Sequence, residues 1–209
     1  MKSTFILFTT FALLFSILQG QNEVKRIETG AILFRLETNI HILNYYKEHN
    51  LLNQADIIKQ ANNNTRIIYP LETPKLKIEI DKQNDENKNI VTTFAKEWSL
   101  CPIYFFYSNF SDQIMNNNFE NVFKSNHDPL NNDEKNALKN NFLIAYIGDS
   151  PGTLKFHSLV VVDNQLQTLP KPYPKYVRTY KGLWFLERKL DTSIKILEKK
   201  IKFALSRIK

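Results

Sequence analysis

Three short apolar runs in the second half of the chain constrain its fold most strongly. They are residues 103–107 (IYFFY), 142–147 (FLIAYI) and 157–162 (HSLVVV). A run of five or six apolar residues between turn-forming residues is typical of a strand buried on both faces of a sheet. Such a strand needs helices on both faces of the sheet to cover it. The runs therefore predict an α/β protein.

The segments before these runs add one strand and two helices. Residues 30–38 alternate like a strand, with Ile32 on one face and Leu33 on the other. A helix is expected from a cap at Asn39 to the polar stop at Asn62. The prolines that follow predict a surface insertion over residues 65–82, with one short strand at 76–80.

The next helix is expected to start near Asn84 or Asp85, with Ile90, Phe94 and Trp98 on one face. Residues 113–123 are predicted as a short helix that leads into a polar, Asn-rich loop.

The remaining segments predict a hairpin and a final helix. The 157–162 strand should turn at Asp163-Asn164 and return over residues 165–169. Asp191 or Thr192 caps the last helix. The apolar stripe of this helix consists of Ile194, Leu197, Ile201, Leu205 and Ile208.

These elements predict a single-domain α/β sandwich, with a central mixed sheet flanked by helices. The order β-α-β-α-β-β-α resembles the thioredoxin-like fold. Redox thioredoxins carry Cys-x-x-Cys, whereas this chain has one thiol, Cys101. The resemblance therefore implies a fold and no activity.

The N-terminus has the layout of a secretory signal peptide. Lys2 supplies a positive charge, residues 5–18 carry none, and Gly20 offers a small residue for cleavage. We expect residues 1–20 to be removed and residues 21–209 to form one domain in the periplasm or outside the cell. An uncleaved N-terminal anchor is the alternative. The few glycines form no phosphate-binding loop, so no nucleotide or other cofactor is expected.

A second resemblance rests on three segments. Residues 101–107 (CPIYFFY), 163–165 (DNQ) and 172–180 (PYPKYVRTY) look like an uncharacterised family of secreted bacterial proteins. This resemblance implies export and transfers no catalytic residues.

Two residues are candidate nucleophiles. Gly148-Asp149-Ser150 follows a buried strand and resembles the nucleophile block of GDSL hydrolases, in which the serine attacks an ester. No histidine follows His157 to serve as its base, and the same residues are good turn formers. Cys101 is a lone thiol, and a small buried residue is the competing interpretation.

The four histidines do not have the spacing of a metal site. His41 and His49 are eight residues apart, whereas a helical zinc pair needs four. We expect His127 to be solvated and His157 to make a hydrogen bond at the edge of the core. No metal is expected.

The charge distribution is strongly asymmetric. Residues 21–163 carry 15 Lys and Arg against 18 Asp and Glu, whereas residues 164–209 carry 12 against 3. Basic groups attract polyanions, and aromatic faces add stacking or cation–π contacts. We expect a binding surface for an acidic protein, an acidic glycan or an anionic membrane, and no nucleic acid. The predicted surface consists of Lys171, Tyr173, Lys175, Tyr176, Arg178, Tyr180, Lys181 and Trp184.

Two hypotheses about function remain. The first is an exported, non-catalytic domain that binds an acidic partner through this surface. Its structural alternative is that the rings pack against the sheet edge while the lysines extend into water. The second is an exported hydrolase or thiol-dependent enzyme that uses Ser150 or Cys101.

Overall fold

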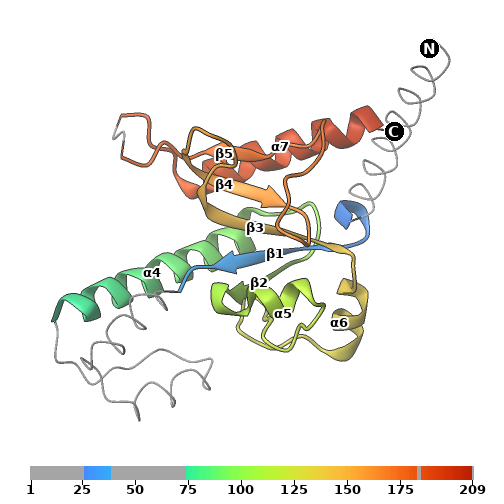
Figure 1. Ribbon diagram of the computed structural model, residues 1–209, viewed down its shortest axis with the longest axis horizontal. Coiled ribbons are helices and arrows are strands. Elements are labelled where there is room, and N and C mark those ends of the chain that lie inside the picture. Colours follow the sequence, from blue (N-terminus) through green and yellow to red (C-terminus); the bar gives the residue numbers. More distant parts are fainter. Residues whose placement is uncertain (1–25, 39–73, 183–184, 209) are drawn as a thin grey trace, which may run out of the picture.

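The computed structural model describes residues 26–38, 74–182 and 185–208. Its described strands form one mixed sheet in the order β2-β1-β3-β4-β5 (Figure 1). β1 runs parallel to β2 and β3, while β4 is antiparallel to β3 and β5. The strands are β1 (Ala31–Leu36), β2 (Ile103–Tyr107), β3 (Phe142–Asp149), β4 (His157–Val162) and β5 (Tyr176–Arg178).

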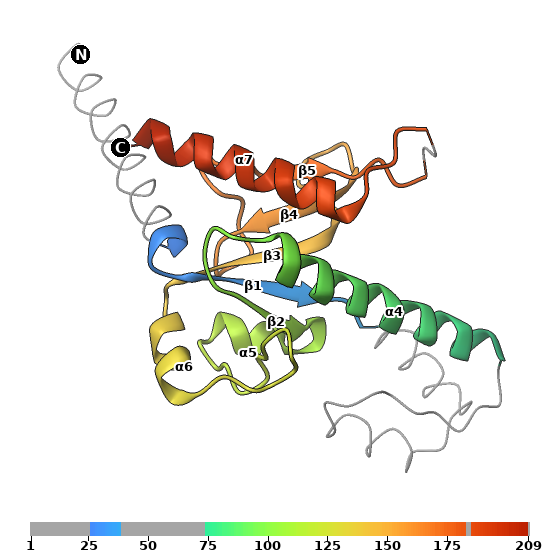
Figure 2. The same cartoon turned by 180° about the vertical axis from the view of Figure 1, so that it is seen from behind.

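Helices cover both faces of this sheet. α4 (Pro74–Glu97) and α7 (Leu190–Ile208) pack on one face, and α5 (Ser111–Met115) and α6 (Asn132–Leu138) on the other (Figures 1 and 2). The predicted α/β class with a mixed, helix-flanked sheet is confirmed. The thioredoxin-like order is not confirmed.

Side chains alternate between the two cores as the sequence predicts. Phe34 on β1 packs into the core under α4 and α7, whereas Leu33 packs into the core under α5 and α6. On β2, Phe105 packs into the core under α4 and α7, and Phe106 packs into the core under α5 and α6. The apolar face of α7 is also confirmed for Ile194, Leu197 and Ile201, each at most 1% exposed.

The strand predicted at residues 76–80 is wrong, because this segment belongs to α4. Pro74 is the first residue of the helix, where its missing N–H is not needed for an intrahelical bond. Ile80 is buried and Ile78 is 65% exposed, which is the pattern of an amphipathic helix. The predicted face of Ile90, Phe94 and Trp98 is buried.

The connections differ from the predictions in three places. The helix expected over 113–123 is only Ser111–Met115, and Phe123 forms β-bridges with Phe105 and Pro129. The polar loop continues into α6, whose N-terminus is capped by reciprocal Asn131 and Glu134 hydrogen bonds. The hairpin after β4 is reduced to one bridge, because β5 pairs with β4 instead.

Several predictions fall outside the described residues. These are the signal peptide at 1–20, the helix that starts near Asn39, residues 65–73 of the insertion, and Trp184.

Candidate functional site

β5, the edge strand of the sheet, divides the predicted binding segment into two groups of residues at its opposite ends. Its first residue, Tyr176, pairs with Val160 near the end of β4. Its last residue, Arg178, pairs with Ser158 near the start of β4. Lys171 and Lys175 therefore lie before the first residue of β5, and Tyr180 and Lys181 lie beyond its other end.

The first group builds a groove against the terminal helix. Pro172 and Pro174 supply apolar walls, and Lys200 and Phe203 of α7 face them across a cavity of about 340 Å³. Lys175 is exposed and Tyr176 is half-buried at this site. We call this site the cationic groove, and its lining residues are Pro172, Pro174, Lys175, Tyr176, Lys200 and Phe203.

Tyr173 does not belong to this surface. It is only 4% exposed and packs in the core under α4 and α7. The prediction that it binds a partner is therefore corrected: its ring belongs to the hydrophobic core. In a run of alternating tyrosines and lysines, the sequence alone does not say which rings face inward.

Lysines at the groove differ from their neighbours in charge pairing. Within the described residues, exposed Lys175 and Lys200 form no ion pair, and neither do exposed Lys171 and Lys199 beside them in the sequence. These four ammonium groups are thus available to an external anion.

Lysines on the opposite flank of α7 are paired. The Lys195 ammonium lies 3.0 Å from Glu97 of α4, and Lys202 lies 3.9 Å from Glu198. The hydrogen bond from Lys195 holds the pKa of Glu97 below its ordinary value. Lys195 therefore links α7 to α4, while Lys200 and Phe203 face the groove.

The second group of predicted residues interacts within the protein. The Arg178 guanidinium stacks 3.8 Å above the ring of Phe156, and Tyr180 lies under Arg188 at 4.8 Å. Lys181 pairs with Glu86 of α4 at 3.8 Å. These contacts fix the end of β5 and leave this group less free to recognise a partner than the groove.

His157, the first residue of β4, is held by Thr179, which directly follows β5. The Thr179 hydroxyl donates to the His157 carbonyl oxygen at 2.9 Å, so the ring Nδ1–H donates to that hydroxyl at 2.6 Å. Burial lowers the pKa of the imidazole, and the charge of Lys181 adds to this effect. The expected hydrogen bond at the core edge is confirmed.

Ser150 lacks the geometry of a nucleophile. It is fully buried, and its Oγ accepts from the Phe156 N–H at 3.0 Å and donates to the Leu154 carbonyl at 3.2 Å. A nucleophilic serine needs exposure and a base in hydrogen-bond reach. Ser150 instead closes the connection between β3 and β4.

Cys101 is similarly unsuited to nucleophilic chemistry. Burial raises the pKa of its thiol to about 11, although the Trp98 indole N–H lowers it in part. The side chain packs against the core under α4 and α7. A reactive cysteine needs the opposite shift.

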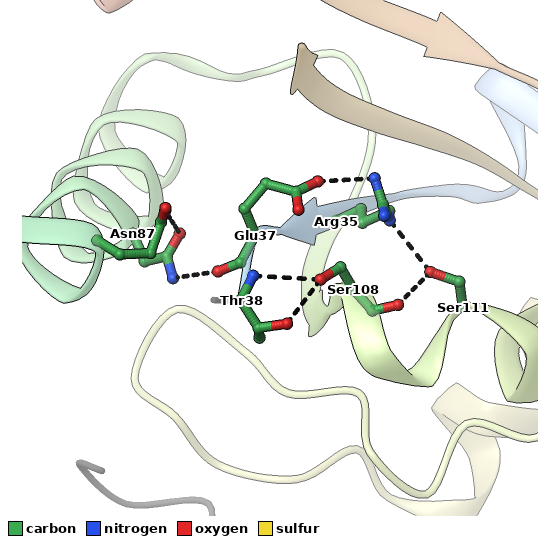
Figure 3. A network of polar contacts seen from close by, with 7 residues as sticks. Arg35, Glu37, Thr38, Asn87, Ser108 and Ser111 are labelled. Atoms are coloured by element: carbon green, nitrogen blue, oxygen red, sulfur yellow. Dashed lines mark hydrogen bonds and ion pairs between the residues drawn. The ribbon is translucent and has the colours of Figure 1, made fainter. Parts of the chain in front are cut away.

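A polar network that the sequence does not predict lies at the carboxyl ends of β1 and β2 (Figure 3). Arg35 donates from Nη1 to Glu37 at 2.7 Å and from Nε to Ser111 at 3.1 Å. The Ser108 hydroxyl accepts from the Thr38 N–H at 3.2 Å. The only sequence signal was a set of polar residues directly after two predicted strands.

This network fastens the end of β1 to the helices around it. Asn87 of α4 is 6% exposed and donates to the Glu37 carbonyl at 2.9 Å (Figure 3). The Ser111 hydroxyl donates to the Ser108 carbonyl at 2.6 Å. Because these groups bind one another, the network holds the end of β1 against α4 and the segment that follows β2.

Among the residues that the structure describes, no three His, Cys, Asp or Glu side chains are grouped to hold a metal ion. Within the same residues, no helix has the length and apolar character needed to cross a bilayer.

Comparison with known proteins finds no match among protein-family models, curated proteins or solved structures. The resemblance to secreted bacterial proteins therefore stays a prediction.

Proposed function

We propose that this protein is an exported, non-catalytic binding module that holds an acidic partner at the cationic groove. One observation carries the proposal: exposed Lys175 and Lys200 line one groove with no ion pair among the described residues, whereas Lys195 and Lys202 of α7 are paired with Glu97 and Glu198. Export rests on the N-terminal sequence alone. The buried Ser150 and the high pKa of Cys101 favour a binding role over catalysis.

The energetics favour a multivalent anion. A single exposed ion pair contributes only about 0–1 kcal/mol, so useful affinity needs several contacts at once. Lys175 and Lys200 line the groove, and exposed Lys171 lies beside it in the sequence, so several contacts are available. Salt should weaken this binding strongly, since exposed charges are screened over about 10 Å at 0.1 M ionic strength.

A charge reversal tests the proposal. We expect Lys175→Glu with Lys200→Glu to weaken retention on immobilised heparin by at least about tenfold, because two attractive contacts become repulsive. The matched control is Lys88→Glu with Lys155→Glu. This control changes the net charge equally at exposed positions on α4 and in the β3–β4 connection.

The comparison between the two pairs decides the result. A weaker retention of the groove variant than of the control supports a defined site. Equal elution of the two variants in a salt gradient would show that heparin senses only the net charge, and the proposal would be wrong.

A further inference from the structure

One flank of α7 combines cations with an exposed aromatic ring. Lys200, Phe203 and Arg207 recur at steps of three and four residues, so they share one side of the helix. The Phe203 ring is 58% exposed, and the Arg207 guanidinium stacks on it at 4.4 Å. Lys200 and Phe203 are also walls of the cationic groove.

Phe203 is not needed to complete the core. Ile201 and Ala204, its neighbours on the helix, are at most 1% exposed and supply the packing. The exposed ring lies among cationic side chains, and it adds nothing to long-range attraction of a soluble polyanion. The ring therefore indicates a partner with an apolar layer behind its negative charges.

A membrane surface has this chemistry. Anionic headgroups attract lysines, aromatic rings enter the boundary between headgroups and acyl chains, and long lysine side chains reach back toward the phosphates. α7 lies along one side of the molecule (Figure 2), so its length can run parallel to a flat surface.

We infer that the cationic groove and the Lys200–Phe203–Arg207 flank dock onto an anionic lipid surface, with the Phe203 ring inserted among the headgroups. This inference rests on the proposed function and names the class of acidic partner. Each lysine near such a surface should contribute about fivefold to the affinity. Partial burial of the ring should contribute about tenfold.

Vesicle co-sedimentation tests the inference. The full protein should sediment with mixed phosphatidylcholine and phosphatidylglycerol vesicles and remain in solution with phosphatidylcholine alone. Phe203→Ser should weaken binding to the mixed vesicles about tenfold and reduce heparin retention much less, because the ring carries no charge. Phe185→Ser is the matched control, because Phe185 is 65% exposed and precedes α7 at the other end of the helix.

A second measurement reports on the ring directly. Phe203→Trp should show a blue-shifted emission component with the mixed vesicles, and brominated lipids should quench it. The unsubstituted protein, whose two tryptophans include buried Trp98, provides the background signal.

The outcomes separate the inference from the proposed function. If heparin retention depends on Lys175 and Lys200 but the protein does not bind anionic vesicles, the partner is an acidic macromolecule and the lipid inference is false. Vesicle binding that is unchanged by Phe203→Ser also contradicts the inference. If neither heparin nor vesicle binding depends on these lysines, both proposals fail.

Discussion

Replacement of Phe94 by alanine should lower the free energy of unfolding by about 3–5 kcal/mol. Phe94 is fully buried where α4 meets the sheet. Its ring centroid lies 4.6 Å from that of Phe34 and 6.3 Å from that of Trp98, so truncation removes two ring contacts and leaves a cavity. Urea unfolding followed by circular dichroism measures the change.

The control for this prediction is Phe203→Ala. Its ring is mostly exposed, so we expect a stability change within about 0.5 kcal/mol of zero. A loss below about 1 kcal/mol for Phe94→Ala would contradict the packing of α4 on β1. A large loss for Phe203→Ala would show that this ring supports the fold and is not free to bind.

Native Cys101 should react with iodoacetamide about a hundredfold more slowly than an ordinary exposed thiol at pH 7.5. Only the thiolate reacts, and burial raises the thiol pKa from 9.0 to about 11, which reduces the thiolate fraction by that factor. Mass spectrometry of the native and urea-unfolded protein measures the labelling rate. Unfolding should restore rapid labelling, and the sole thiol of the chain makes the signal unambiguous.

Rapid labelling of the native protein would overturn this conclusion. It would mean that the thiol is ionised and accessible, and it would return a thiol-dependent enzyme to consideration. Labelling that is slow in the unfolded protein as well would remove burial as the cause.

Local patterns predicted the strands of the central sheet well. The apolar runs at 103–107, 142–147 and 157–162 correspond to β2, β3 and β4. The side chains of each run are enough to predict a buried strand, because a strand covered on both faces is apolar along most of its length. β3 extends further, to Asp149, because pairing of Asp149 with His157 continues the ladder into the expected turn.

Elements with short or mixed local signals were missed. α4 starts ten residues before the expected Asn84, because Pro74 occupies the first helical position, where proline starts a helix and does not break it. β5 has only three residues, and nothing in these three residues predicts that they pair with β4. Only the tertiary fold selects this strand over the hairpin expected at 165–169.

The candidate site was predicted in part. Charge asymmetry directs attention to the C-terminal region, where Lys175 and Tyr176 line the groove. Lys200 and Phe203, which also line the groove, lie more than twenty positions away, on a helix for which the sequence favours packing on the core over lying on a membrane. Arg178 and Lys181 meet Phe156 and Glu86, which no spacing rule connects to them.

The most direct test of the central claim is to locate a bound polyanion by amide NMR. A size-defined heparin oligosaccharide should shift the resonances of residues 171–176 and 199–203, and these shifts should disappear in the Lys175→Glu, Lys200→Glu variant. Shifts that cluster instead around Arg35 and Ser108, or that spread evenly over all basic residues, would contradict a recognition site at the cationic groove.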